Sequence, residues 1–248
     1  MDSNKTSNVL GVLHKVAVFI AIAVILLATA NYSASSKKPL VYEEHLSDVA
    51  ATIDGEELTL DDIAFYVVYE EKQIEEQALI YNADSTKDYW NLHIDGVFIA
   101  ADAKKAAIGM AIHDYIFYKK AVEMGMELDA EEEIYLENRI EDFWMDLFDE
   151  QLERMPTTED KINSSIYKMA LAQKYQEYIA LENGRLFHEY DWDGYDYTKL
   201  EEAEHKVKIN KKVWNKVKLG DITLNHESVS YINGLTDSER QEIINNKK

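Results

Sequence analysis

Few residues of this sequence stand at the spacings that catalysis requires. Ser165 and Lys168 form a Ser-x-x-Lys pair, the arrangement in which a lysine can activate a serine as a nucleophile. The Ser-Asp-Asn and Lys-Thr-Gly companions of that chemistry are absent from the sequence, and no Gly-x-Ser-x-Gly frame occurs. We therefore interpret the pair as ordinary helix surface and predict no catalytic residue.

Metal-binding patterns in the sequence are also incomplete. None of the seven histidines stands at the His-Glu-x-x-His spacing of a zinc site. Residues 191–196 partly match a calcium loop, and Glu202 stands at its twelfth position, but Asp196 occupies the sixth, where the loop requires glycine. A plain turn is the simpler interpretation, so we predict no metal and no cofactor. His113 is expected to be a packed or hydrogen-bonded residue of a helix.

Two helices joined at a tight corner form the centre of the predicted fold. The segment 102–124 is apolar on two faces, which indicates a central helix. Gly125 follows where a residue with positive φ would end that helix, and Asp129 with Glu132 forms a capping-box pair that begins the next. This next helix, predicted over 130–155, carries a broad apolar stripe. The stripe is either core or a binding groove, and core is favoured because a helical domain buries one face of every helix.

Further elements surround these two helices. A hairpin is predicted over 49–58, with its turn at Asp54-Gly55. Thr59 then caps a helix predicted over 60–80, and another amphipathic helix is predicted over 159–181. The pattern predicts a mainly α-helical domain over residues 45–197.

A short mixed α/β tail is predicted over residues 198–248. Thr198 with Glu201 offers a capping box for a short helix, and strands are predicted at 207–209 and 222–224. Because β-prone segments occur only at the two ends of the domain, we expect the tail to pack back on the hairpin.

The N-terminus carries the signal for a cellular compartment. Lys5 and Lys15 precede the apolar run 16–30, which is short for a membrane span of about 20 residues and ends in a small-x-small sequence. Residues 1–30 are therefore predicted to be either a cleaved signal peptide or an uncleaved membrane anchor. Both place the rest of the chain outside the cytoplasmic membrane, and the Ser-rich residues 31–44 are predicted to be a linker.

The composition excludes several classes of protein. A net charge of −21 repels the phosphate backbone of nucleic acids, so we predict that the protein does not bind them. The absence of cysteine excludes disulfides, thiol catalysis and a lipid-modified cysteine after export. With 46% hydrophobic residues and only two prolines, the chain can bury a helical core.

One segment departs from this acidic composition. Residues 205–219 contain six lysines and no acids, and valine and isoleucine alternate with lysine at its start, as in a half-exposed strand. The segment could pack against the acidic helical domain or lie near anionic lipid, and a plain solvated strand face is a third interpretation.

At two places the sequence resembles a known family. Residues 107–133 run as an alanine, an apolar helix, Ala121-x-x-x-Gly125 and an acid-rich helix start, and residues 49–65 form a short hairpin and first helix. In this order the two segments resemble the N-terminal domain of SurA- and PrsA-like extracytoplasmic chaperones. Together they cover well under half of the chain. The resemblance implies a SurA N-terminal-like helical domain.

The resemblance also implies a function. Relatives often carry a parvulin-type peptidyl-prolyl isomerase domain of on the order of 100 residues, but only 64 residues follow Gly184 and they lack its motifs. The resemblance therefore implies an extracytoplasmic holdase that binds unfolded or newly exported polypeptides by apolar contacts. The membrane would be a second partner if the N-terminal segment is uncleaved. Broad aromatic surface would suit such clients, and we predict that it is formed by Tyr115, Phe117, Phe143, Trp144 and Phe148.

Two other functions remain open at this point. One is a peptidyl-prolyl isomerase with a degenerate site. The other is a non-catalytic module that docks one dedicated envelope protein. The sequence does not separate the holdase from the docking module.

Overall fold

The computed structural model describes residues 39–226, and the compact unit within them begins at Leu40. Of the described residues, 63% are helical and 9% lie in strands, which confirms a mainly α fold. The predicted signal or anchor segment 1–30 lies outside the described residues. The linker was predicted to extend to residue 44, but its last residues belong to the compact unit, because Tyr42 of the short helix η1 (Tyr42–Glu44) is buried and donates a hydrogen bond to the Leu60 carbonyl.

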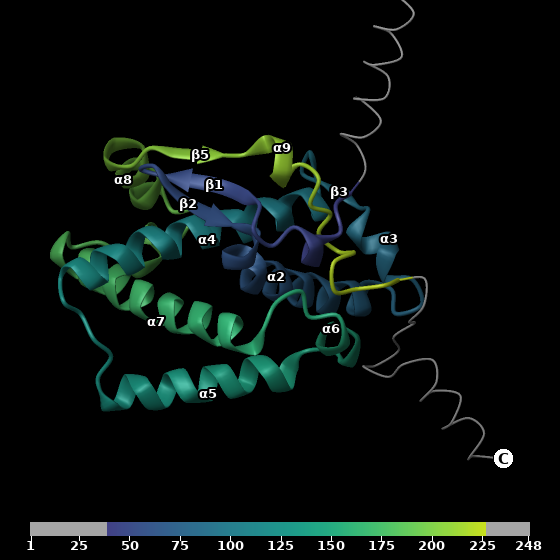
Figure 1. Ribbon diagram of the computed structural model, residues 1–248, viewed down its shortest axis with the longest axis horizontal. Coiled ribbons are helices and arrows are strands. Elements are labelled where there is room, and N and C mark those ends of the chain that lie inside the picture. The colour runs from purple at the N-terminus through teal and green to yellow at the C-terminus, as the bar shows by residue number, and fades with distance from the viewer. Residues whose placement is uncertain (1–38, 227–248) are drawn as a thin grey trace, which may run out of the picture. The chain divides into compact units, whose positions relative to one another are not determined.

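A three-stranded antiparallel sheet covers one side of the unit, with strand order β2-β1-β5 (Figure 1). The predicted hairpin is formed by β1 (Val49–Ile53) and β2 (Glu56–Thr59), and both turn residues, Asp54 and Gly55, have positive φ, as a tight two-residue turn requires. The third strand, β5 (Val207–Ile209), pairs with β1, so the tail packs back on the hairpin as predicted.

Three long helices form the core next to this sheet. They are α2 (Leu60–Tyr81), α4 (Ile99–Glu123) and α7 (Glu159–Glu182), and α4 contacts both of the others. Thr59 and Asp62 form a capping box that begins α2, and Gly125 adopts positive φ just after α4. No helix among residues 39–226 is long and apolar enough to cross a membrane.

Short elements lie between the long helices and after α7. They are α3 (Thr86–Trp90), β3 (His93–Ile94), β4 (Val97–Phe98), η2 (Phe187–Tyr190), α8 (Tyr195–Glu204) and α9 (Lys211–Trp214). The predicted capping box at Thr198 and Glu201 is wrong, because α8 already begins after Gly194 and the Thr198 hydroxyl donates to the Gly194 carbonyl inside the helix. Gly194, the residue before α8, lies so close to the Glu189 backbone that a Cβ atom would not fit, so only glycine suits this position.

The helix predicted over 130–155 is in fact two helices. α5 (Ala130–Asp146) begins with the predicted capping box of Asp129 and Glu132, and α6 (Asp149–Glu153) follows after two extended residues. Leu147 is buried at this break. The break also turns Gln151 toward α2, where its amide donates to the Val68 carbonyl at 3.3 Å and to the Thr223 hydroxyl at 3.0 Å. Tertiary contacts therefore end α5 earlier than its apolar pattern predicts.

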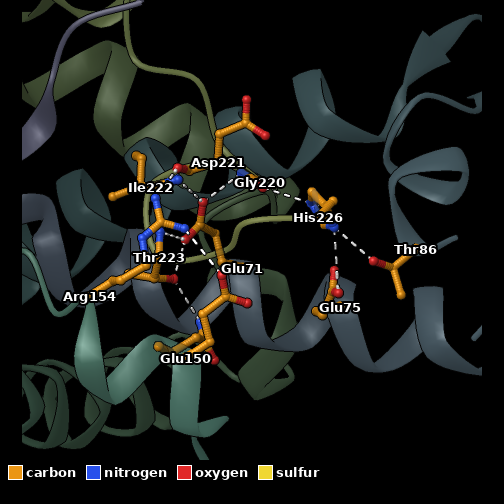
Figure 2. A network of polar contacts seen from close by, with 11 residues as sticks. Glu71, Glu75, Thr86, Glu150, Arg154, Gly220, Asp221, Ile222, Thr223 and His226 are labelled. Atoms are coloured by element: carbon orange, nitrogen blue, oxygen red, sulfur yellow. Dashed lines mark hydrogen bonds and ion pairs between the residues drawn. The ribbon is translucent and has the colours of Figure 1, made fainter. Parts of the chain in front are cut away.

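A buried carboxylate on α2 holds the C-terminal part of the unit (Figure 2). Glu71 is fully buried and accepts hydrogen bonds from the backbone amides of Gly220 (2.6 Å), Ile222 (3.0 Å) and Thr223 (2.9 Å), and from the Thr223 hydroxyl. Burial raises the pKa of Glu71, and these four hydrogen bonds oppose the rise. Residues 222–224, predicted to be a strand, instead wrap around Glu71, because their amides pair with a carboxylate rather than with another strand.

The same segment is fixed a second time one turn further along α2. Glu75 is fully buried, and its Oε2 accepts a hydrogen bond of 2.7 Å from the Trp90 indole. His226 lies 2.7 Å from the Thr86 hydroxyl and 2.8 Å from the Gly220 carbonyl, and its Nδ1 lies 3.7 Å from Glu75 Oε1 (Figure 2). The segment up to His226 is thus an integral part of the compact unit.

Candidate functional site

A cavity of about 350 Å³ lies between α2, α5 and α7. Its apolar wall consists of Phe65 and Tyr69 of α2, Phe143 of α5, and Ile166 and Met169 of α7. Polar side chains surround the opening, and they are Lys72, Gln73, Arg139, Asp142, Asp146 and Gln173. The cavity therefore has an aromatic and aliphatic floor within a charged rim, as binding sites for largely apolar ligands have.

A second hollow of about 210 Å³ continues from the first toward η2. Phe65, Tyr69, Met169 and Gln173 line both hollows. The second adds Met110, Phe187 and Trp192 to the apolar surface. We call the two hollows together the α5 trough, with the apolar residues Phe65, Tyr69, Met110, Phe143, Ile166, Met169, Phe187 and Trp192.

One wall of the first hollow is α5, which lies along α7 on the side away from the sheet (Figure 1). The second hollow has no lining residue from α5. No side chain of Ala130–Asp146 is fully buried. Polar contacts attach the helix to its neighbours: Arg139 donates to Gln173 at 2.7 Å, Trp144 donates to Asn163 at 2.8 Å, and Lys72 lies 3.4 Å from Asp146. Because apolar burial is small here, α5 is the long helix that costs least to displace.

The five residues predicted to bind a client do not form one surface. Phe143 lines the trough, with its ring centroid 5.3 Å from that of Phe65. Trp144 and Phe148 are half-buried against the core. Tyr115 lines a different hollow beside β2, where its hydroxyl donates to Glu56.

The prediction for Phe117 needs correction, because its fully buried side chain lines neither hollow. It packs in the core against His113, Tyr175 and Tyr197. Residues two apart on a helix point in nearly opposite directions, so Tyr115 and Phe117 cannot line one wall together. The trough residues that sequence reasoning missed on α2, Phe65 and Tyr69, were visible only as a widening of its apolar face.

A buried polar cluster supports the floor of the second hollow. Tyr66 donates to Asp114 Oδ2 at 2.9 Å, and His113 Nδ1 lies 2.7 Å from Asp114 Oδ1. The other ring nitrogen of His113 lies 2.9 Å from the Tyr190 carbonyl, which ties η2 to α4. Burial and the neighbouring Asp114 raise the pKa of Tyr66. His113 is thus a packed, hydrogen-bonded residue as predicted, and the cluster fixes the trough floor.

The other candidates for chemistry are not assembled into a site. The Ser165 hydroxyl donates to the Lys161 carbonyl of its own helix at 3.1 Å, while the Lys168 ammonium lies 5.9 Å from the Tyr118 ring centroid. In the partial calcium loop, Asp191 accepts from Gln176 and Asp196 pairs with Arg185. Within residues 39–226, no group of three or more histidines or acids is arranged to hold a metal ion.

Comparison with known proteins adds no assignment to this geometry: no family model, no curated protein and no solved structure matches the chain.

Proposed function

We propose that the protein is an extracytoplasmic holdase-type chaperone that binds unfolded, newly exported polypeptides in the α5 trough. The observation that carries the proposal is the trough itself, two adjoining hollows that share Phe65, Tyr69 and Met169. The first of them is bounded by α5, a helix without a fully buried side chain. The resemblance of residues 49–65 and 107–133 to SurA- and PrsA-like chaperones supports the same function.

The chemistry of the trough suits clients of varied sequence. Tyr69, Phe143 and Trp192 offer aromatic surface, and Met110 and Met169 offer flexible, polarisable side chains. Such surfaces adapt to many apolar segments without requiring a fixed register. The charged rim, which includes Arg139 and Asp142, leaves the polar residues flanking a bound segment in contact with water.

The proposal is tested with the full chain and an unfolding model client whose aggregation is followed by light scattering. Tyr69 lines both hollows and is 38% exposed, so Tyr69→Ser removes apolar surface from the centre of the trough. Tyr167, on α7, is 40% exposed and lines neither hollow, which makes Tyr167→Ser a matched control. We expect the wild-type chain and the Tyr167→Ser variant to slow aggregation equally and the Tyr69→Ser variant to slow it several-fold less.

Two results would contradict the proposal. The first is a wild-type chain that leaves client aggregation unchanged. The second is an equal loss of activity in the two tyrosine variants, which would place the binding surface elsewhere. Prolyl cis/trans isomerisation is measured in parallel, and we expect no acceleration, because the trough contains no group positioned for a reaction.

A further inference from the structure

Four exposed lysines form a basic face on this acidic protein. Lys206 and Lys208 lie on or directly beside β5, and Lys211 and Lys212 lie in α9. β5 is an edge strand of the sheet, and α9 follows it directly along the same edge (Figure 1). We call these four residues the β5–α9 lysine face. The rest of the chain is strongly acidic, with a net charge of −21 for the whole sequence.

The lysines of this face are not neutralised by the protein. Among the described residues, none of the four ammonium groups forms an ion pair. Two nearby acids have other partners: Asp54 pairs with His205 at 2.7 Å, and Glu204 pairs with Lys120 at 3.4 Å. A third acid, Glu57 of β2, lies on the same face of the sheet as Lys208, with Thr52 between them. The segment 205–219 itself packs on the unit, with Trp214, Val217 and Leu219 buried, but these four ammonium groups form no ion pair with its described residues.

The face is held rigidly rather than carried on a free tail. Val207 and Ile209 turn toward the core and pack against it, so Lys206 and Lys208 point outward. The Asn210 side chain donates to the Val49 carbonyl at 2.8 Å and accepts from the Lys212 amide at 3.2 Å, which fixes α9 to β1. Trp214 anchors the end of α9 in the core. Pre-organised charges lose little conformational entropy when they bind.

The chain enters the compact unit beside this face. The Leu40 amide donates to the carbonyl of Lys216, two residues after α9, at 3.1 Å. In the sequence, eight residues (31–38) separate Pro39 from the apolar run 16–30, and the last two are Lys37 and Lys38. Eight extended residues span at most about 28 Å. An apolar run held in a bilayer would therefore keep Pro39, where the chain enters the unit, within about that distance of the lipid headgroups.

We propose that the β5–α9 lysine face docks on the anionic headgroups of a lipid bilayer and orients the unit on the membrane. Lipid phosphate is the partner that unpaired, outward-pointing lysines attract, and the neighbouring apolar run supplies the proximity. Each lysine near an anionic leaflet strengthens attraction by roughly five-fold at physiological salt. The inference does not depend on client binding in the α5 trough.

The test uses the full chain bound to vesicles and a probe that reports headgroup contact. Because the sequence contains no cysteine, one engineered cysteine can be labelled without background. Asn215→Cys places a fluorophore at the end of α9, and Glu137→Cys places it on the exposed side of α5 as a reference. Quenching by a headgroup spin label is compared between vesicles with about one-third phosphatidylglycerol and vesicles of phosphatidylcholine alone.

The matched variants change three charges each. Lys208, Lys211 and Lys212 are replaced by Gln on the face, and Lys105, Lys168 and Lys199, which are also exposed, are replaced by Gln as the control. We expect quenching at position 215 in the anionic vesicles, a loss at 0.5 M salt, and a 10- to 100-fold weaker docking equilibrium in the face variant alone. Position 137 is expected to remain unquenched.

The proposal would be overturned by equal quenching at positions 215 and 137. It would also be overturned if quenching at position 215 were the same in neutral and anionic vesicles. Equal effects of the two triple variants would also overturn it. Far-UV circular dichroism checks that both variants fold. If the face variant does not fold, the labelled chain with all its lysines decides the question. Its quenching at position 215 is then compared between neutral and anionic vesicles and between low and 0.5 M salt.

Discussion

Replacement of Glu71 by glutamine should destabilise the protein strongly, because this carboxylate is the acceptor for four donors of the C-terminal segment. Glu71 Oε1 accepts from the amides of Gly220 and Ile222, and Oε2 accepts from the amide and hydroxyl of Thr223. Three of these donors are backbone amides, which cannot act as acceptors, so both Glu71 oxygens are fixed as hydrogen-bond acceptors. A glutamine side chain retains one oxygen, and its NH2 group then faces two donors.

The magnitude follows from these contacts. A hydrogen bond to a charged group contributes roughly 1.5–3 kcal/mol, and a buried donor left without an acceptor costs about 1–3 kcal/mol. The Thr223 hydroxyl can rotate and already accepts from Gln151, so only one amide is left fully unpaired. We expect Glu71→Gln to lower the free energy of unfolding by about 3 kcal/mol. For a protein of this size, this corresponds to a decrease in Tm of roughly 6–12 °C.

Urea unfolding of the full chain at pH 7, followed by far-UV circular dichroism, measures this change. The matched control is Glu76→Gln on the same helix, where an exposed carboxylate pairs with Lys72 at 3.1 Å and contributes at most about 0.5 kcal/mol. Hydrogen exchange should accelerate at the amides of Gly220, Ile222 and Thr223 in the Glu71→Gln variant only. Equal stability of the two variants would refute the reasoning.

Three further substitutions have definite expected results. Burial, with a smaller effect of nearby Asp102, raises the pKa of Glu70 to about 7. A carboxyl group whose pKa is raised in the folded state stabilises the fold below its unfolded pKa, and this contribution is lost as the pH rises toward 7. Glutamine does not titrate. Glu70→Gln should therefore flatten the dependence of stability on pH between about 4.5 and 7. Urea titrations across that range check this, and an unchanged slope would count against it. Gly125→Ala should lower the free energy of unfolding by about 1 kcal/mol, because Gly125 has a φ of 66°; thermal unfolding measures this, and a stabilised variant would be inconsistent. Phe117→Ala should cost about 3–5 kcal/mol of stability, yet slow client aggregation normally wherever it remains folded; a selective loss of that activity would return Phe117 to the binding surface.

The elements set by local sequence were predictable. Asp54-Gly55 specified a hairpin turn, and Thr59 and Asp129 specified helix starts, because the interactions that fix these positions span only two to four residues. The break between α5 and α6 was missed, since neither Leu147 nor Phe148 is a helix breaker. The chain turns there because the Gln151 side chain pairs with Val68 and Thr223, residues that lie 83 and 72 positions away.

The site was predictable only in part. Phe143 was expected in a binding surface and lines the trough, but the floor comes from α2, α4, α7 and η2, which no local pattern brings together. Phe117 was misplaced because that side of α4 faces the core, and Tyr115 was misplaced because it faces β2 and Glu56 rather than the trough. The wrap of residues 220–223 around Glu71 was equally hidden, because a buried glutamate has no signature in the sequence.

The most direct test of client binding places a fluorophore in the trough. Asp142→Cys lies on its rim, and Glu137→Cys lies on the same helix but lines neither hollow. With an environment-sensitive fluorophore, we expect the emission of the label at position 142 to shift saturably to the blue when an unfolded client is added. The folded client should cause no shift at position 142, and neither form of the client should cause a shift at position 137. Two results would contradict binding in the trough. One is an unchanged emission at position 142 with a client whose aggregation the protein suppresses, and the other is an equal shift at both positions.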